Sequence, residues 1–322
     1  MRVFITGAAG FIAPFLAKHC IAAGCNVFGI DHREAQNDWP DARFQVCDVR
    51  DAGRLLNLIA EYKPDRIFHL SAQSYSTVSM VHPQETFESN VGGTINLYEA
   101  LRTLKLMPTV VVACSSAEYG LVAAKDLPVR ETHSLLPLHP YGVSKVAQDL
   151  LAAQYFANYK IPSIRIRIFN TTGPGKKDDV CSDLTKRAME IVLGIRSPVL
   201  KVGNTTPRRA IIDVRDQVRG LWLAAEHCQA GEVYNLGAES IYSVQEIIEE
   251  IRSQLGIGFE LEQEPSLVRA CDEPVIAGDM TKFRGCCTWS AEIPLATTIH
   301  DMLEWWRARF AGSLRPVSSQ KV

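Results

Sequence analysis

The segment Gly7-Ala-Ala-Gly-Phe-Ile-Ala13 lies between the apolar run Val3–Ile5 and a segment of helix length. Glycines between a strand and a helix let the backbone approach a diphosphate, which then lies at the positive end of the helix dipole. Ala13 occupies the third position of the motif, where a small residue is needed for helix packing. We therefore predict a dinucleotide-binding turn, with cofactor contacts from Gly7, Gly10, Phe11 and Ile12.

Strand-length apolar runs alternate with helix-length segments through the first half of the chain. Such alternation, with short links, is typical of a parallel, doubly wound sheet whose strands are buried on both faces. We predict an α/β fold of the Rossmann type with about seven strands. The expected strands of the first half include Val3–Ile5, Asn26–Ile30, Arg66–Leu70, Thr109–Ala113 and Ser163–Phe169.

After Asn170 the pattern changes to loops, a helix near Cys181–Leu193 and short strand-like runs, among them Ala210–Val214. This texture favours a smaller C-terminal α/β lobe that binds the substrate. We expect residues 1–170 and about 211–238 to form the cofactor domain, 171–210 and 239–310 the lobe, and 311–322 a polar tail.

Asp31 ends the second predicted strand, about 20 residues after the glycine turn. A carboxylate there accepts hydrogen bonds from the adenosine ribose and repels a 2′-phosphate, which favours NAD(H) over NADP(H). His32 and Arg33 follow directly and can cradle a phosphate, so NADP(H) stays open as a second choice. Asp48 and Val49, after the third strand, are predicted to contact the adenine.

Tyr141 and Lys145 are four residues apart, and so lie on one face of a predicted helix. An ammonium beside a phenol favours the ionised form, which makes the phenol an acid/base near neutral pH. Ser115 and Ser116 follow the fourth long strand, at the carboxyl edge where doubly wound folds bind ligands. These four residues are the candidates for the catalytic end of the site.

Composition restricts the class of protein and its partners. The chain has 322 residues, 22% of them charged, with a net charge of −2, which does not favour nucleic acid or an anionic membrane as a partner. The N-terminus lacks the features of a secretory signal, and no run of about 18 apolar residues occurs. Nine cysteines without a CxxC pair indicate reduced thiols in a cytoplasmic protein and no metal site.

Six motifs occur along the chain in the order found in one known family: GxxGxxA, His69-Leu-Ser-Ala72, Asn90-Val-Gly-Gly-Thr94, Ser115-Ser-Ala-Glu-Tyr-Gly120, Tyr141-Gly-Val-Ser-Lys145 and Phe169-Asn170. The chain thereby resembles the extended short-chain dehydrogenase/reductase family over roughly residues 1–310. Its members are epimerases, dehydratases and reductases of nucleotide sugars. The resemblance implies a nucleoside-diphosphate sugar as substrate.

The resemblance also implies roles for individual residues. Tyr141 would be the acid/base, and Lys145 would lower its pKa and hold the nicotinamide ribose. Ser115 would hydrogen-bond the sugar C4 oxygen. Further expected contacts are Leu70 and Ala72 to the cofactor, and Ser116, Asn170, Arg209 and Arg269 to the nucleotide sugar.

A homodimer is implied as well, through a four-helix bundle made of the predicted helices Pro83–Leu104 and Tyr141–Tyr159 from each subunit. Apolar side chains on these segments that could face the partner or the core are Leu97, Leu101, Leu150, Leu151 and Tyr155.

The exact reaction stays open at the level of sequence. Phe169–Lys176, Val202–Asn204 and Asp213–Asp216 resemble the GDP-4-keto-6-deoxy-mannose reductases of deoxysugar biosynthesis, which form GDP-rhamnose. Ser-Ser-Ala together with Asp31 resembles the 4-epimerases that retain NAD. A 4,6-dehydratase is disfavoured, because Glu118 lies one position later than the carboxylate such enzymes need. A nucleotide-binding protein without catalysis is the alternative of another class.

Overall fold

The computed structural model describes residues 1–35, 39–265 and 275–313. Seven strands form the main sheet in the order β11-β6-β5-β4-β1-β2-β3, and every neighbouring pair is parallel. This confirms the predicted doubly wound α/β class. The strands are β1 Arg2–Thr6, β2 Asn26–Asp31, β3 Arg43–Val46, β4 Arg66–His69, β5 Thr109–Ser115, β6 Ser163–Ile168 and β11 Val233–Leu236.

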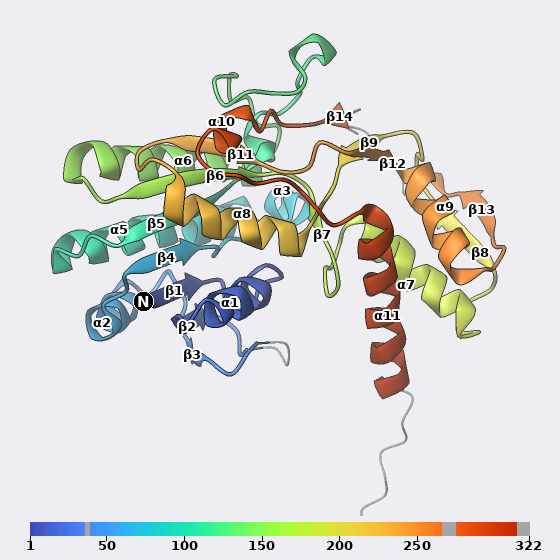
Figure 1. Cartoon of the computed structure of the whole chain (residues 1–322), viewed down its shortest axis with the longest axis horizontal. Helices are drawn as coiled ribbons and strands as arrows, with labels where there is room; N and C mark the ends of the chain where they lie inside the picture. The colour runs from blue at the N-terminus through green and yellow to red at the C-terminus, as the bar shows by residue number, and fades with distance from the viewer. Residues whose placement is uncertain (36–38, 266–274, 314–322) are drawn as a thin grey trace, which may run out of the picture.

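Helices cover both faces of this sheet (Figure 1). Side chains alternate along β1, so Val3 and Ile5 pack in the core beneath α1 and α8, whereas Phe4 packs in the core beneath α2, α5 and α6. Burial on both faces explains why the strands read as continuous apolar runs. The covering helices are α1 Ala13–Ala22, α2 Ala52–Tyr62, α5 Gly93–Leu104, α6 Pro140–Tyr159 and α8 Val214–His227.

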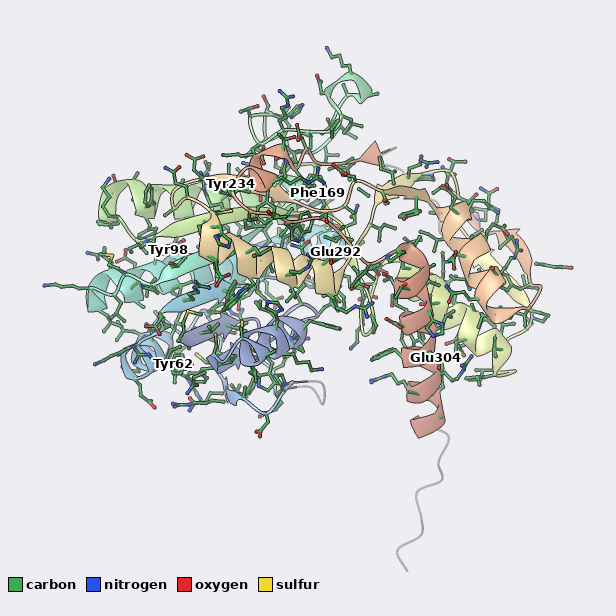
Figure 2. The ribbon with its side chains drawn as sticks, in the orientation of Figure 1. Tyr62, Tyr98, Phe169, Tyr234, Glu292 and Glu304 are labelled. Atoms are coloured by element: carbon green, nitrogen blue, oxygen red, sulfur yellow. The ribbon has the colours of Figure 1, made fainter. Side chains whose placement is uncertain are left out.

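A separate hydrophobic core holds the smaller lobe, which lies to one side of the sheet in Figure 1. In Figure 2, Tyr62 and Tyr98 mark the sheet side and Glu304, on α11, the lobe side. The lobe contains α7 Val180–Val192, β8 Val199–Val202, α9 Val244–Leu255, β13 Glu260–Gln263 and α11 Leu295–Ser313. Because α11 continues to Ser313, the predicted tail is helical over residues 311–313, and the rest of it lies outside the described residues.

Short elements join the two parts. The predicted strand Ala210–Val214 is in fact two short strands followed by a helix, since α8 already begins at Val214. Asp213 accepts a hydrogen bond from the amide of Arg215 and so caps that helix. The joining elements are β7 Thr171–Thr172, β9 Arg208–Ala210, β10 Ile212–Asp213, β12 Ile241–Ser243, β14 Val275–Ile276 and α10 Thr281–Arg284.

The predicted helix Pro83–Leu104 is interrupted. It consists of α4 Pro83–Phe87, a π-helical turn Glu88–Gly92, and α5, with α3 Ser76–Val81 before it. A π turn inserts one extra residue into a helix and is frequent at functional sites. Two short 3₁₀ turns, Ser116–Glu118 and Ala124–Asp126, complete the elements. Over the described part of the chain, no helix has the length and apolar character to cross a membrane.

Candidate active site

The glycine turn lies where the sequence predicts it, between β1 and α1. Gly7 has a φ of +75°, and a Cβ added to it would lie 2.8 Å from the Leu70 carbonyl carbon and from the Ser71 amide nitrogen. The amide of Gly10 donates to the Gly7 carbonyl at 2.9 Å. Only glycine therefore fits at position 7, and the turn is held against the end of β4, where the connection carrying Ala72 begins.

Asp31 is buried at the end of β2, and its carboxylate faces the glycine turn. Oδ2 accepts from the Ala9 amide at 3.1 Å, and Oδ1 accepts from the Arg33 amide at 3.0 Å. Nδ1 of His32 lies 3.1 Å from the same oxygen. Asp31, His32 and Arg33 thus form one cluster. The residue that favours NAD(H) and the two that could bind the 2′-phosphate of NADP(H) therefore lie at the same site.

Asp48 and Val49, the residues predicted to contact the adenine, both pack against neighbours in the structure. Three contacts of 2.6–3.1 Å join the guanidinium of Arg50 to the Asp48 carboxylate, and this hydrogen bonding lowers the pKa of Asp48. Val49 is buried against Gly93, where an added Cβ would approach the valine side chain to 2.5 Å. The Asp48 carboxylate is thus occupied by a neighbour in its own loop.

Ser115, Tyr141 and Lys145 come together at the carboxyl end of β5. The phenol of Tyr141 lies near the Ser115 hydroxyl, whose interaction with it favours a lower pKa of the phenol. Lys145 is buried, donates from Nζ to the Ala113 carbonyl at 2.8 Å, and lies 5.8 Å from the centroid of the Tyr141 ring. The carbonyl of Ala113 is a partner that the sequence motifs did not indicate.

The expected lowering of the Tyr141 pKa does not occur in the protein alone. Burial raises the pKa of Tyr141 to about 12, against the opposing effect of the Ser115 hydroxyl. Burial also lowers the pKa of Lys145 to about 8. The ammonium is directed to a backbone carbonyl and lies beside the aromatic ring, so it does not offset the burial of the phenol.

Glu118 points into the protein interior, as its position one residue late in the motif predicts. It is fully buried, and its Oε1 accepts from the Ser115 amide at 2.8 Å, completing a capping box around the 3₁₀ turn. Its Oε2 accepts from Nε of Arg167 on β6 at 3.1 Å. The spacing of Ser115 and Glu118 is the sequence signature of a capping box, so the contact between Glu118 and the Ser115 amide could have been predicted from the sequence.

The ion network continues from Arg167 to the catalytic helix. Arg167 donates to Asp149 on α6 at 2.9 Å, and Arg165 donates to the other oxygen of Asp149 at 2.6 Å. Cys114, Glu118 and Asp149 place potential metal-ligand atoms within 4.8 Å of one another. Because guanidinium groups already occupy both carboxylates, we assign this cluster as an ion-pair network. Burial, and then the neighbouring Asp149, raise the pKa of Glu118.

Neutral hydrogen bonds hold the other side of the catalytic helix. Asn90, in the π turn, donates to the Gln73 carbonyl at 3.1 Å and to Ser144 Oγ at 2.9 Å. His69 lies between Thr6 and Thr94, with contacts of 2.8 and 2.9 Å, and burial lowers the pKa of His69 to about 3. The connection after β4, the first strand and α6 are thereby fixed to one another.

The predicted substrate residues are not all brought together. Ser116 is buried beside Ser115, and Asn170 is exposed at the end of β6, where its carbonyl accepts from the Ile212 amide at 3.0 Å. Arg209 is half-buried on β9 and donates to the Arg208 carbonyl at 3.0 Å. Arg269 lies outside the described residues.

A family model described as GDP-mannose 4,6 dehydratase matches residues 4–302, which is most of the chain. The chain belongs to this family. The match extends through both the sheet and the lobe, and it confirms the resemblance predicted from the six motifs. The protein is thus an NAD(P)-dependent nucleotide-sugar enzyme of the extended short-chain dehydrogenase/reductase type.

The chain is similar to enzymes that catalyse different reactions. GDP-6-deoxy-D-mannose reductase of Pseudomonas aeruginosa is 27% identical, over 96% of this chain and 98% of that protein. The structure of RMD from Pseudomonas aeruginosa complexed with NADPH has a TM-score of 0.84 at 26% identity, covering 96% of this chain and 99% of that one. UDP-glucose 4-epimerase from Brucella ovis in complex with NAD has a TM-score of 0.83 at 26% identity, covering 95% and 98%.

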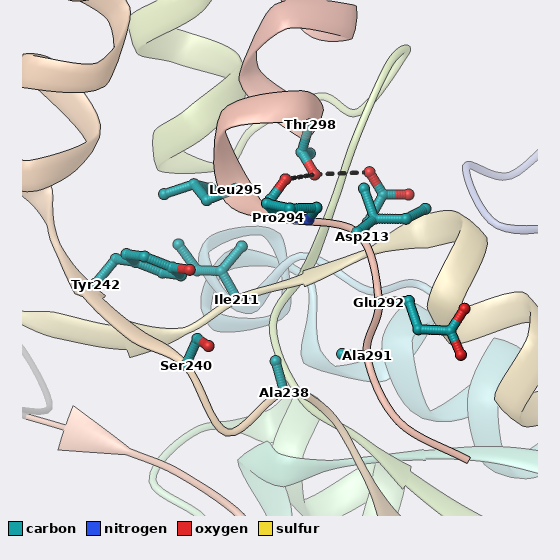
Figure 3. Close-up of a pocket in the computed structure, with 11 residues that line it drawn as sticks. Ile211, Asp213, Ala238, Ser240, Tyr242, Ala291, Glu292, Pro294, Leu295 and Thr298 are labelled. Carbon is teal, nitrogen blue, oxygen red and sulfur yellow. Dashed lines mark hydrogen bonds between the residues drawn. The ribbon is translucent and has the colours of Figure 1, made fainter. Parts of the chain in front are cut away.

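In this family member, a cavity of about 260 Å³ lies at the joint between sheet and lobe (Figure 3). Thr298 Oγ1 donates to Asp213 at 2.7 Å and also contacts the Pro294 carbonyl at 3.3 Å. Arg215 contacts the same Asp213 carboxylate through two 2.8 Å contacts. None of the three predicted catalytic residues lines this cavity. Both acids that line it are already paired, Asp213 with Arg215 and Glu292 with Arg219, so we assign the cavity a structural role.

Proposed function

We propose that the chain reduces a GDP-4-keto-6-deoxy-hexose at C4, using a nicotinamide cofactor as hydride donor. The observation that carries this proposal is the placement of Tyr141 beside Ser115 at the carboxyl end of β5, with Glu118 turned away from both. That arrangement provides a proton donor for a C4 oxygen but not the carboxylate that elimination of water requires. Similarity to GDP-6-deoxy-D-mannose reductase over nearly the full length of both chains supports the choice of substrate.

In the proposed reaction, the cofactor supplies hydride to the C4 carbon. Tyr141 gives the C4 oxygen its proton, and Ser115 holds that oxygen through its hydroxyl. Lys145 is proposed to hold the nicotinamide ribose and, once the cofactor is bound, to favour the phenolate left by proton transfer, an effect that its ammonium does not exert on Tyr141 in the protein alone. Ser116, Asn170, Arg209 and Arg269 are proposed to bind the nucleotide sugar.

We propose that NAD(H) is preferred and that NADP(H) is the second choice. The buried Asp31 carboxylate supports this, because it repels a 2′-phosphate. The cofactor contacts proposed are those predicted from the sequence: Gly7, Gly10, Phe11, Ile12, Asp31, Asp48, Val49, Leu70, Ala72, Tyr141 and Lys145. Asp48 would have to exchange its Arg50 contacts to serve the adenine.

A second candidate is a 4-epimerase that retains NAD. It is favoured by Ser115-Ser-Ala117 with Asp31 and by the similarity to the Brucella ovis epimerase structure. The two reactions differ in whether they consume the cofactor, since an epimerase regenerates its NAD whereas a reductase oxidises one reduced cofactor per sugar.

The test is to denature the purified protein, identify any released nucleotide, and then supply substrates. For the reductase we expect no retained NAD and one NAD(P)H oxidised for each GDP-4-keto-6-deoxy-mannose consumed. Retained NAD together with interconversion of UDP-glucose and UDP-galactose would favour the epimerase. Tight NAD binding without turnover of any nucleotide sugar would favour the non-catalytic alternative.

We also propose a homodimer in the cytoplasm, with the cofactor domain and lobe divided as predicted. Of the five side chains that could face either the partner or the core, only Leu150 is exposed, while Leu97 and Leu101 are in the core. Tyr155 is buried and stacks on Tyr98 at 4.6 Å, and Leu151 packs against the same core. Exposed apolar side chains of α3, α4, α5 and α6 support the interface instead, namely Met80, Val81, Phe87, Ile95, Val143 and Leu150.

A further inference from the structure

A glycine-rich loop, residues 173–179, joins β7 to helix α7 and passes over the cofactor turn. Gly173 has a φ of +148°, and a Cβ added to it would lie 2.8 Å from Val214 and 3.7 Å from the Phe11 ring. The amide of Lys176 donates back to the Gly173 carbonyl at 3.1 Å, which folds the loop on itself. The ammonium of Lys176 then lies 4.9 Å from the centroid of the Phe11 ring.

Lys176 is half-buried, and in the part of the chain that the structure describes it forms no ion pair. Within residues 1–35, 39–265 and 275–313, no carboxylate lies at ion-pair distance from its ammonium and no group accepts a hydrogen bond from it. The two neighbouring acids act on Lys176 only at longer range: Asp179 caps α7 by accepting from the Ser182 amide at 2.6 Å, and Asp178 is exposed beside Tyr75. Burial lowers the pKa of Lys176, and the charges of Asp179 and Asp178 nearby offset this effect only in part.

An ammonium held in this way is suited to bind an anion. Phe11 belongs to the glycine turn, whose backbone amides and helix terminus attract a diphosphate. The predicted substrate arginine Arg209 lies on β9, a different element that pairs with β12 and β14. The anion nearest to Lys176 is therefore expected to belong to the dinucleotide and not to the nucleotide sugar.

We propose that Lys176 binds the diphosphate of the dinucleotide cofactor, adding a lobe-side cation to the amides of the glycine turn. The proposal rests on the proposed function only in requiring that the turn bind a dinucleotide. Since the loop leads directly into α7, the contact joins the cofactor to the first helix of the substrate lobe. Lys176 is then a binding residue for the cofactor and not a catalytic one.

The test compares Lys176→Met with Lys177→Met in the full-length protein. Lys177 is the next residue and is exposed, so its substitution removes the same charge without removing the buried ammonium. NADH is titrated by its fluorescence, and ADP-ribose, which keeps the diphosphate but lacks the nicotinamide, is used as a competitor. We expect Lys176→Met to raise the Kd of both about tenfold or more, the usual effect of losing a charge-assisted contact, and Lys177→Met to change them less than twofold.

Two further measurements complete the test. Lys176→Arg keeps the cation and should recover most of the affinity, and Lys176→Gln repeats the loss should the Met variant fold poorly. Equal NADH affinity in wild type and both neutral variants would overturn the proposal, as would weaker GDP binding with NADH affinity unchanged. The readout is cofactor affinity, so an absence of sugar turnover, which contradicts the proposed function, leaves this comparison intact.

Discussion

The two ends of the candidate site are built on opposite electrostatic principles. At the catalytic end, Glu118 and Arg167 are buried and joined by a 3.1 Å contact, so the charges are enclosed by protein. At the adenosine end, Asp31 is buried, but its partner Arg33 has a side chain that is 56% exposed. Water screens the second pair far more than the first.

This difference separates positioning from selection. Breaking a buried charge pair leaves an uncompensated ion in a medium of low dielectric constant, so the network beneath Ser115 and Tyr141 holds its elements in one geometry. A pair with an exposed partner exchanges readily, so Arg33 can leave Asp31 and meet a ligand. The catalytic end is therefore expected to respond to mutation through turnover and stability, and the adenosine end through choice of cofactor.

The largest effect is expected for Tyr141→Phe. It removes the proton donor but keeps the ring that packs beside Lys145, so turnover should fall by roughly 10²–10⁴. Binding of the nucleotide sugar, measured by calorimetry, should barely change. Lys145→Met should reduce both turnover and NADH affinity. Undiminished turnover in the Tyr141 variant would exclude the proposed mechanism for either substrate.

Glu118→Ala should have the next largest effect, because it leaves Arg167 short of a buried partner and frees the Ser115 amide. The expected loss is about 1–3 kcal/mol in the free energy of unfolding, measured by urea denaturation at pH 7, because the buried Ser115 amide loses its acceptor while Arg167 keeps its contact with Asp149. The matched control is Glu304→Ala, which breaks an exposed contact with Arg307 and should cost less than about 1 kcal/mol. Similar losses in the two variants would show that the buried network contributes no more to the free energy of unfolding than an exposed ion pair does.

The same contrast explains what the sequence could predict. The glycine turn depends on neighbours within one strand–helix unit, and the pair Tyr141 and Lys145 depends only on helical spacing, so both follow from local pattern. The network of Glu118, Arg167 and Asp149 joins residues 18–49 positions apart on three elements, and no periodicity reports such contacts. Only the contact between Glu118 and the Ser115 amide is local, and the capping-box spacing could have predicted it.

The substrate side was predicted less well for a related reason. Arg209 and Asn170 were assigned from motifs alone, and their relation to Ser115 depends on how the lobe packs against the sheet. The continuous helix predicted over Pro83–Leu104 missed the π turn, because an inserted residue changes the phase of a helix without changing its composition. The turn places Asn90 against Ser144, a contact that helical periodicity does not anticipate.

Asp31→Ser should change the selectivity at the adenosine end. Removing the carboxylate leaves Arg33 available to a 2′-phosphate, so the ratio of NADPH to NADH affinity should rise about tenfold or more. Arg33→Met is the matched variant and should lower that ratio. Tighter binding of NADPH than NADH by the wild type would mean that Arg33 and His32 already outweigh Asp31.

The smallest effect is expected at His69, which tests whether burial alone sets the charge state at the catalytic end. Its pKa is about 3 in the folded protein and near 6.5 when exposed, so the unfolded chain binds the extra proton between these values. Stability is therefore full above pH 6.5 and declines as the pH falls toward 3, by at most about 1.4 kcal/mol per pH unit from this group.

His69→Gln keeps polar atoms between Thr6 and Thr94 but cannot titrate. Urea denaturation at pH 7 and pH 5 should give a smaller pH-dependent loss in the variant than in the wild type. An equal loss in both proteins would mean that His69 is already protonated in the folded state. An imidazolium donates from both ring nitrogens, so the hydroxyls of both threonines would then have to act as acceptors.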